Sequence, residues 1–425
     1  MKRAIGYLVP MIQAARPPIR SIFNLTVFVA ALGYFVDMFD LLLFPIVRQS
    51  SLTALGIPPG EAQITVGAFL LNAQMVGMLL GGIFWGVLGD RKGRLSTLFG
   101  SIALYSVANI ANAFVTDIPS YAFWRFMAGL GLAGELGAAV TLVSEILPKE
   151  LRGYGTAVVA SVGVFGTVTA ALVGRYLTWQ HAYLVGGCLG LLLLCLRMGM
   201  RESLMFKKTE SAEGAMVKRG DFFSLFTAWS RFGRYLRCIL IGLPLWFIMG
   251  ILIFFLPEFG PSLRVVGKLD PAVAIACCYS GVTVGSLASG FLSQAWGSRT
   301  KVVGIFMAAA FVGVAVFLLG RGFSAFWMYV LTACMGLAAG YWAVYVTIAA
   351  EQFGTNLRAT VATTVPNFLR GSVVLITSGF LLLKGPLGLL GAAWVVGLAC
   401  FALAAVSLAG LEDTHGRDLD FMEKE

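Results

Sequence analysis

The chain changes abruptly from apolar to basic at the stretch GVLGDRKGR, residues 86–94, which separates two long apolar runs. These runs, residues 64–88 and 95–116, contain no Lys, Arg, Asp or Glu. A helix rises about 1.5 Å per residue and the hydrocarbon core of a bilayer is about 30 Å thick, so each run is long enough to cross a membrane. A short basic loop between two such runs predicts a helical membrane protein.

The same pattern continues along the whole chain. Of its 425 residues, 58% are hydrophobic and 12% are charged, whereas soluble domains carry about 25% charged residues. We predict an all-α membrane protein with twelve transmembrane helices, at residues 22–47, 64–89, 95–116, 119–146, 153–175, 178–200, 236–258, 270–296, 301–319, 323–350, 357–383 and 386–411.

One long polar stretch divides these spans into two sets of six. The predicted domains are an N-terminal six-helix bundle (1–200), a cytoplasmic linker (201–235), and a C-terminal six-helix bundle with a short cytoplasmic tail (236–425).

The two halves also resemble each other in sequence. Glu145 and Glu351 are each followed seven residues later by an arginine, Arg152 and Arg358, and the two elements are 206 positions apart. Residues 290–299 match residues 86–94 at a displacement of 204, with Gln294 in place of the aspartate. Duplicated six-helix halves with a substrate site between them are a transporter architecture.

The positive charge follows the membrane topology. The formal net charge is +10, but most Lys and Arg residues lie in alternate loops on the side that holds both termini. This excess predicts that the protein spans the inner (plasma) membrane with both termini in the cytoplasm. Because the topology accounts for the positive charge, we expect no nucleic-acid partner.

The sequence lacks the residues that a metal site or an intramembrane enzyme would need. The seven cysteines lie in or beside apolar spans and the chain has two histidines, so neither a metal site nor a cofactor is expected. An intramembrane enzyme would need a catalytic constellation that the sequence does not contain, and a channel or receptor would not need the two-fold repeat. We expect a monomer whose partners are lipid, protons and a small organic solute.

The loop of residues 86–94, placed between spans two and three, resembles the signature loop of the major facilitator superfamily. Arg125 with Gly129 and Gly131 resembles the fourth-span motif of this superfamily, and residues 412–419 resemble the tail of its metabolite branches. The resemblance covers the whole chain. It implies two pseudo-symmetric six-helix bundles that transport a solute by alternating access.

In this superfamily the loop latches the two halves in one state. The resemblance assigns this role to residues of the loop, and we interpret the acidic residues of the repeated element as gate residues that pair with nearby arginines. The expected gate and latch residues are Gly86, Asp90, Arg91, Gly93, Arg94, Glu145, Arg152, Glu351 and Arg358.

Two further segments narrow the resemblance. Residues 37–40 (DMFD) resemble a motif in span one of the sialate:proton and aromatic-acid:proton symporters, and residues 131–137 resemble a Gly-Glu segment of sialate and metabolite:proton symporters. Both imply symport of an organic acid with protons.

Ionisable residues within the spans need a functional or structural reason, because each costs about 2.5–3.5 kcal/mol at the bilayer centre. Asp37 and Asp40 share one face of span one, and Glu135 lies near the centre of span four. Desolvated carboxylates are suited to proton uptake and release near neutral pH. We interpret Asp37 and Glu135 as the leading proton-coupling residues, assisted by Asp40; the alternative is a structural ion pair.

Arg370 near the centre of span eleven has no arginine counterpart in the first half, where the equivalent position is Val164. A guanidinium binds a carboxylate with two parallel hydrogen bonds, so we interpret Arg370 as the substrate-carboxylate partner; the alternative is an ion pair between helices. The further substrate-binding candidates are Asn367, Tyr341, Tyr345, Trp246 and Arg125. The aromatic residues and Arg125 have packing as their alternative role.

The leading functional hypothesis is proton-coupled symport of a small organic anion, a carboxylate metabolite. The alternative is a proton-driven exporter of a drug-like or siderophore-like solute. Residues 163–170 of span five lack the proline of the Gly-Pro motif that antiporters of the superfamily carry, which favours the symporter.

Overall fold

The chain folds into helices, as the apolar runs predict. The structure, a computed structural model, describes residues 25–92, 94–135, 152–197 and 222–416. In the N-terminal half, each predicted span contains one helix: α1 (Leu25–Ala54), α2 (Glu61–Lys92), α3 (Arg94–Asn112), α4 (Ile118–Leu132), α6 (Arg152–Tyr176) and α7 (Trp179–Arg197).

Several spans of the C-terminal half are interrupted. A short 3-10 helix, η2 (Phe222–Phe226), precedes the seventh span, which consists of α9 (Trp229–Leu240), α10 (Leu243–Phe247), the π-helical turn η3 (Ile248–Ile253) and α11 (Leu256–Ser262). α12 (Pro271–Ala295) and α13 (Arg299–Leu319) are continuous, and the tenth span consists of α14 (Ala325–Ala339) and α15 (Trp342–Glu351). The chain ends with α16 (Thr355–Gly371) and α17 (Val373–Ala409).

α17 contains the end of the eleventh span and all of the twelfth. It reverses direction at Gly388, whose φ of 68° is a conformation that glycine adopts without strain. Contacts on either side of the reversal show it. Lys384, before it, pairs with Glu61 at the start of α2, at 2.9 Å. Gly410, after it, lies beside α9, where its carbonyl accepts a hydrogen bond from Arg237 at 2.8 Å. By length and composition, eight helices of the described residues can cross a membrane, and one of these, Thr360–Ala409, covers both passes. The break predicted between residues 383 and 386 therefore lies slightly later.

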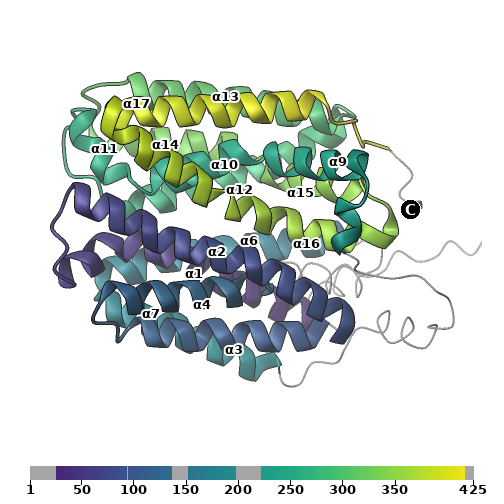
Figure 1. Cartoon of the computed structure of the whole chain (residues 1–425), viewed down its shortest axis with the longest axis horizontal. Coiled ribbons are helices and arrows are strands. Elements are labelled where there is room, and N and C mark those ends of the chain that lie inside the picture. Colours follow the sequence, from purple (N-terminus) through teal and green to yellow (C-terminus); the bar gives the residue numbers. More distant parts are fainter. Residues whose placement is uncertain (1–24, 93, 136–151, 198–221, 417–425) are drawn as a thin grey trace, which may run out of the picture.

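The helices form two bundles that lie one above the other in Figure 1, α1–α7 below and α9–α17 above. The bundles meet where α2 packs on α16 and where α6 packs on α12. We call the end where α1 connects to α2 the α1–α2 end, and the opposite end, where residues 410–416 lie, the tail end. This is the all-α, twelve-helix fold that the sequence predicts.

Glycines set the closest helix contacts, and they repeat between the bundles. A Cβ at Gly77 or Gly81 of α2 would lie 2.1 or 2.4 Å from a backbone oxygen of α4, and a Cβ at Gly281 or Gly285 of α12 would lie 2.1 or 2.0 Å from one of α14. Gly281 follows Gly77 by 204 positions, and Gly285 follows Gly81 by the same number. This is also the displacement between the two repeated loops. Small residues spaced by four allow such backbone contact in membranes, so the same helix contact was built in both halves.

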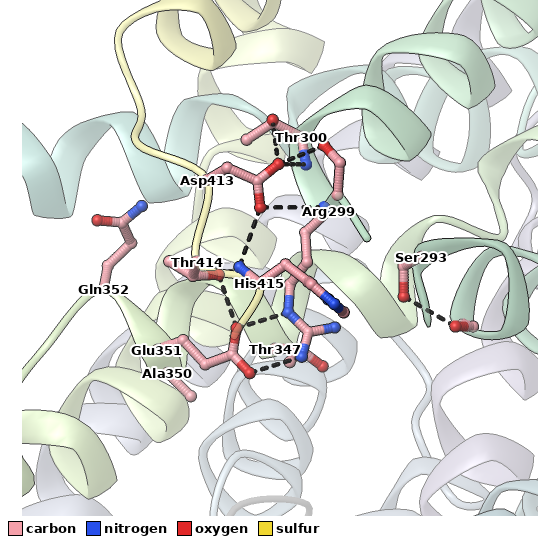
Figure 2. Close-up of polar contacts among 12 residues, drawn as sticks. Ser293, Arg299, Thr300, Thr347, Ala350, Glu351, Gln352, Asp413, Thr414 and His415 are labelled. Atoms are coloured by element: carbon pink, nitrogen blue, oxygen red, sulfur yellow. Dashed lines mark hydrogen bonds and ion pairs between the residues drawn. The ribbon is translucent and has the colours of Figure 1, made fainter. Parts of the chain in front are cut away.

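The C-terminal segment is bound to the tail end of its own bundle (Figure 2). Asp413 accepts hydrogen bonds from the Ser298 hydroxyl, from the backbone N–H groups of Arg299 and Thr300 at 3.2 and 3.3 Å, and from the Thr300 hydroxyl at 2.8 Å. It therefore caps the N-terminus of α13, where backbone N–H groups lack partners.

Beside it, the predicted latch residue Glu351 accepts two hydrogen bonds from Arg299, at 2.6 and 2.7 Å, and one from Thr414 at 2.6 Å. Arg358, the arginine of the repeated element, donates to the Ala350 carbonyl at 3.2 Å. Glu351 therefore pairs with the arginine of the second signature-like loop and fixes the tail within one bundle.

We predict that Gly281→Ala destabilises the protein, because the new methyl group must push α12 away from the Ala333 carbonyl. Overpacking of this kind costs about 1–3 kcal/mol. The matched control is Gly290→Ala in the same helix, where a Cβ would meet nothing within 4 Å. Thermal unfolding of the purified variants checks this, and equal midpoints for the two would contradict the helix contact.

A second prediction concerns pH. Partial burial raises the pKa of Asp413. Hydrogen bonds from Ser298, His415 and Thr300 together lower this pKa by more than burial raises it, so the pKa lies below its usual value. The charged form then stabilises the fold above the unfolded-state pKa of about 3.9, and this contribution is lost as pH falls through the lower folded-state pKa. Asp413→Ala is expected to lower the melting midpoint at pH 7 and to differ less from the parent protein below pH 4. A difference that does not shrink in acid would contradict a role for the charge.

Candidate functional site

Two carboxylates of α1 lie inside the protein. Asp37 is 0% and Asp40 4% exposed. Neither oxygen of Asp37 receives a hydrogen bond within the described part of the chain, whereas Asp40 has the Asn109 side chain beside it. Burying an ionised carboxylate without hydrogen bonds or an opposite charge is costly. Each must therefore be neutral or be balanced by a nearby cation.

For Asp37 this cation is Arg370 of α16, which belongs to the other bundle. The two side chains lie within electrostatic range of each other, but they form no ion pair within 4.0 Å among the described residues. Arg370 is 2% exposed, and its Nε has no acceptor in the described chain. Its Nη1 donates only a long bond, 3.4 Å, to Asn367 Oδ1. The structure thus brings together two of the predicted site residues and leaves both with unused bonding capacity.

Asn367 joins this pair to the N-terminal bundle. Its Nδ2 donates to the Ala133 carbonyl at the end of α4, at 3.3 Å, and to Thr363 of its own helix at 3.1 Å. A Cβ at Gly82 of α2 would lie 2.7 Å from the Asn367 Cβ, so that glycine permits the approach. Asn367 therefore both orients Arg370 and holds α16 against the opposite bundle.

An apolar cavity lies beside the Asp37–Arg370 pair, toward the α1–α2 end. The volume open to a water-sized sphere is about 30 Å³, room for about two waters and far below the roughly 300–1,000 Å³ of a drug-sized ligand site, so the cavity is contracted in this conformation. Both bundles line it, with Leu41, Pro45, Met75, Trp246, Met249 and Tyr279 among the residues on its wall. Leu41 follows Asp37 by one helical turn. Tyr279 of the cavity wall also lies within electrostatic range of Arg370 and Asp37, although neither charged side chain is among the residues that line the cavity.

The predicted aromatic residues divide into two groups. Trp246 of α10 lines the cavity, next to the π-helical turn that supplies Met249 and Ile253; π-helical turns occur frequently at functional sites. Tyr341 and Tyr345 are 0% exposed and do not line this cavity. The Tyr341 hydroxyl donates to the Ile241 carbonyl at 3.1 Å, and Tyr345 stacks on Trp342. Both tyrosines pack between helices, which was their alternative role.

Arg125 of α4 faces Asp40 within the N-terminal bundle. The two lie within electrostatic range, and the Arg125 guanidinium packs 4.6 Å from the centre of the Phe44 ring. Its Nη2 donates to Gln74, whereas its Nε and Nη1 have no acceptor among the described residues. Arg125 is fully buried and therefore does not extend to the membrane surface. It balances the charge of Asp40 at a distance from the cavity.

Glu135 has a partner that the sequence interpretation did not assign. Arg197 of α7 donates to its two carboxylate oxygens at 2.5 and 3.0 Å, and both side chains are buried. Gly33 of α1 provides the space, since a Cβ there would lie 2.1 Å from Glu135 Oε1. The alternative reading of Glu135 as a member of an ion pair thus fits its surroundings, with Arg197 in place of Arg125. An arginine inside an apolar run was the available signal.

The first-half latch lies largely beyond what the structure describes. Gly86 is described and has open space beside it. The structure does not describe the side chains of the other expected latch residues of this half, which are Asp90, Arg91, Gly93, Arg94, Glu145 and Arg152.

The fold is similar to that of solved structures. It resembles the inward-open xylose transporter XylE from E. coli, with a TM-score of 0.70, 16% identity, and coverage of 95% of this chain and 98% of the other. At this identity the likeness concerns the fold alone.

Sequence relatives are solute transporters by name. The niacin transporter NiaP of Acinetobacter baylyi is 26% identical, covering 80% of this chain and 83% of its own. The sialic acid transporter NanX of Escherichia coli is 26% identical, covering 71% of each chain. The 3-(3-hydroxy-phenyl)propionate transporter of Escherichia coli is 34% identical over 32% of this chain and 35% of its own.

The family resemblance of the signature loop is confirmed over most of the sequence. The model of the Major Facilitator Superfamily matches residues 24–378, which include all of the first bundle and most of the second. Together with the two-bundle fold, this match shows that the chain belongs to the Major Facilitator Superfamily.

Proposed function

We propose that this transporter carries a small organic anion together with protons, by alternating access between its two bundles. One observation carries the proposal: a buried aspartate and a buried arginine from opposite bundles lie within electrostatic range of each other near an apolar cavity, with bonding capacity unused on both. Polar residues in the membrane interior mark substrate and ion pathways.

The anion follows from Arg370. A guanidinium remains charged in proteins, so this buried cation favours a ligand with negative charge, and its free Nε edge suits a carboxylate. The apolar wall of the cavity favours a substrate with a hydrophobic body. Niacin, sialic acid and 3-(3-hydroxyphenyl)propionate, named for the relatives, are all carboxylic acids.

Proton coupling follows from charge balance. Without substrate, ionised Asp37 balances Arg370. A substrate carboxylate at Arg370 adds a second negative charge nearby, and a proton on Asp37 removes the resulting repulsion. Anion and proton therefore bind cooperatively, and each raises the affinity for the other by the same factor.

From the excess of Lys and Arg in alternate loops we infer that the tail end faces the cytoplasm and that the protein spans the plasma membrane. We infer that the protein acts as a monomer, since the site lies between the two bundles of one chain. Asp40 assists Asp37 from one helical turn away, while Glu135, held by Arg197, positions α1.

The test uses purified protein in proteoliposomes with nicotinate, 3-(3-hydroxyphenyl)propionate and sialic acid, and with D-xylose as an uncharged control. We expect an acid outside to drive accumulation of at least one of the anions. Asp37→Asn should abolish this accumulation and retain exchange of labelled for unlabelled substrate. Arg370→Gln should weaken anion binding about 10–100-fold, because a bond to a charged group contributes about 1.5–3 kcal/mol.

Arg321→Gln is the matched control and should leave binding unchanged, since among the described residues Arg321, at the α1–α2 end, donates to the carbonyls of Leu318 and Gly320 beside it. Full acid-driven accumulation by Asp37→Asn, or unchanged anion affinity in Arg370→Gln, would rule out the proposed roles.

A separate prediction distinguishes Glu135 from Asp37. Glu135→Gln leaves Arg197 as an unpaired buried charge, which costs about 3–5 kcal/mol, so the melting midpoint should fall clearly. The double variant Glu135→Gln with Arg197→Met should recover stability and keep acid-driven uptake. If Glu135→Gln instead melts like the parent protein and loses the response to acid, Glu135 carries the proton.

A further inference from the structure

Arg48 is a fully buried arginine near the end of α1, at the α1–α2 end of the molecule. It is 0% exposed. Its Nη2 donates to the Phe254 carbonyl at 3.2 Å, and its Nη1 donates to the Gln63 carbonyl at 3.3 Å. The guanidinium also packs against the rings of Phe254 and Phe255, at 4.8 and 5.1 Å from their centres.

Its charge partner belongs to the other bundle. Arg48 Nη2 lies 2.6 Å from Glu258 Oε1 of α11, and the Glu258 side chain is 8% exposed. Gln49 donates to the same oxygen at 3.3 Å. Gly67 of α2 makes room for the arginine, because a Cβ there would lie 2.8 Å from Arg48 Cδ. The ion pair is thus enclosed by both bundles.

An aromatic contact lies directly below this pair. Phe44, one turn before Arg48 on α1, meets Phe254 across the bundle interface, with ring centres 5.9 Å apart. Phe254 and Pro45 both line the apolar cavity. Along α1 and along the seventh span, the order from the cavity outward is therefore aromatic contact first and ion pair second.

Two other ion pairs join the bundles at this end, and both are more exposed. Arg175 lies 3.7 Å from Asp270, with the two side chains 52% and 35% exposed. Lys384 lies 2.9 Å from Glu61, whose side chain is 81% exposed. Solvent-exposed pairs contribute little to stability. Among the described residues, the Arg48–Glu258 pair is the buried ionic bond that closes this end.

We propose that Arg48 and Glu258, with Phe44 and Phe254 beneath them, form the outer gate of the cavity. The term outer rests on the orientation given under the proposed function; the closure itself does not. Opening requires the ion pair to separate, because its members lie on opposite bundles. The pair therefore sets how often the cavity opens toward the outside.

The experiment measures accessibility, so that it does not depend on a substrate. The full chain, with its seven native cysteines replaced by serine or alanine, carries the single reporter Ile253→Cys on the cavity wall. A membrane-impermeant maleimide is added outside right-side-out vesicles. We expect slow labelling with the parent gate and at least fivefold faster labelling in Arg48→Met and in Glu258→Gln. Arg175→Met, which removes the exposed pair at the same end, should change the rate less than twofold.

Each single variant leaves one buried charge unpaired, so the double variant Arg48→Met with Glu258→Gln, which leaves none, serves where a single variant does not fold; thermal unfolding of each variant verifies the fold. Folded Glu258→Gln that labels at the parent rate would overturn the gate. Faster labelling only from the opposite side, measured in inside-out vesicles, would overturn the assignment of the gate to the outer face. Failure of the transport proposal appears separately, as absence of anion uptake by the parent protein, and leaves the labelling rates unaffected.

Discussion

The low dielectric of the membrane interior requires that buried charges be balanced, and this constraint organises the central region. Three acidic side chains are matched by three arginines there: Asp37, Asp40 and Glu135 by Arg370, Arg125 and Arg197. The Glu135–Arg197 pair is complete within one bundle, and Asp40 and Arg125 also belong to that bundle. Among these matches, the one between Asp37 and Arg370 crosses the interface. A change in charge at this position, by proton or by anion, therefore acts between the bundles and not within one of them.

The fold could be predicted because it depends on properties that are local in sequence. Each apolar run is long enough to cross the bilayer by itself, and the repeated loops imply duplicated halves. The glycine pairs of α2 and α12 carry the same displacement of 204 positions, so the tightest helix contacts of both bundles were also readable from the repeat. The predicted break between the last two spans lies a few residues before the observed reversal at Gly388. Apolar residues continue through this region, and the positive φ of Gly388 marks where the chain turns.

The site was harder to predict because the rotation of a helix about its axis is not encoded in the run of apolar residues. Both faces of a buried membrane helix are apolar, so Tyr341 and Tyr345 could not be separated from Trp246 by composition, although only Trp246 lines the cavity. The partner of Glu135 lies 62 residues away on α7. Such a pairing depends on how three helices pack, and the sequence supplies only the observation that Arg197 needs an acceptor.

α1 connects the charged site to the closed end of the cavity. Asp37, Asp40, Phe44 and Arg48 follow one another at three or four residues, so they form a stripe along one side of the helix. Phe44 contacts Arg125, the cation opposite Asp40, and it also contacts Phe254, whose carbonyl binds Arg48. A change in the position of α1 at its carboxylates is therefore transmitted to the ion pair through side chains that touch. The buried charges and the closure thus share one helix, which provides a physical basis for linking ligand binding to the opening of the bundles.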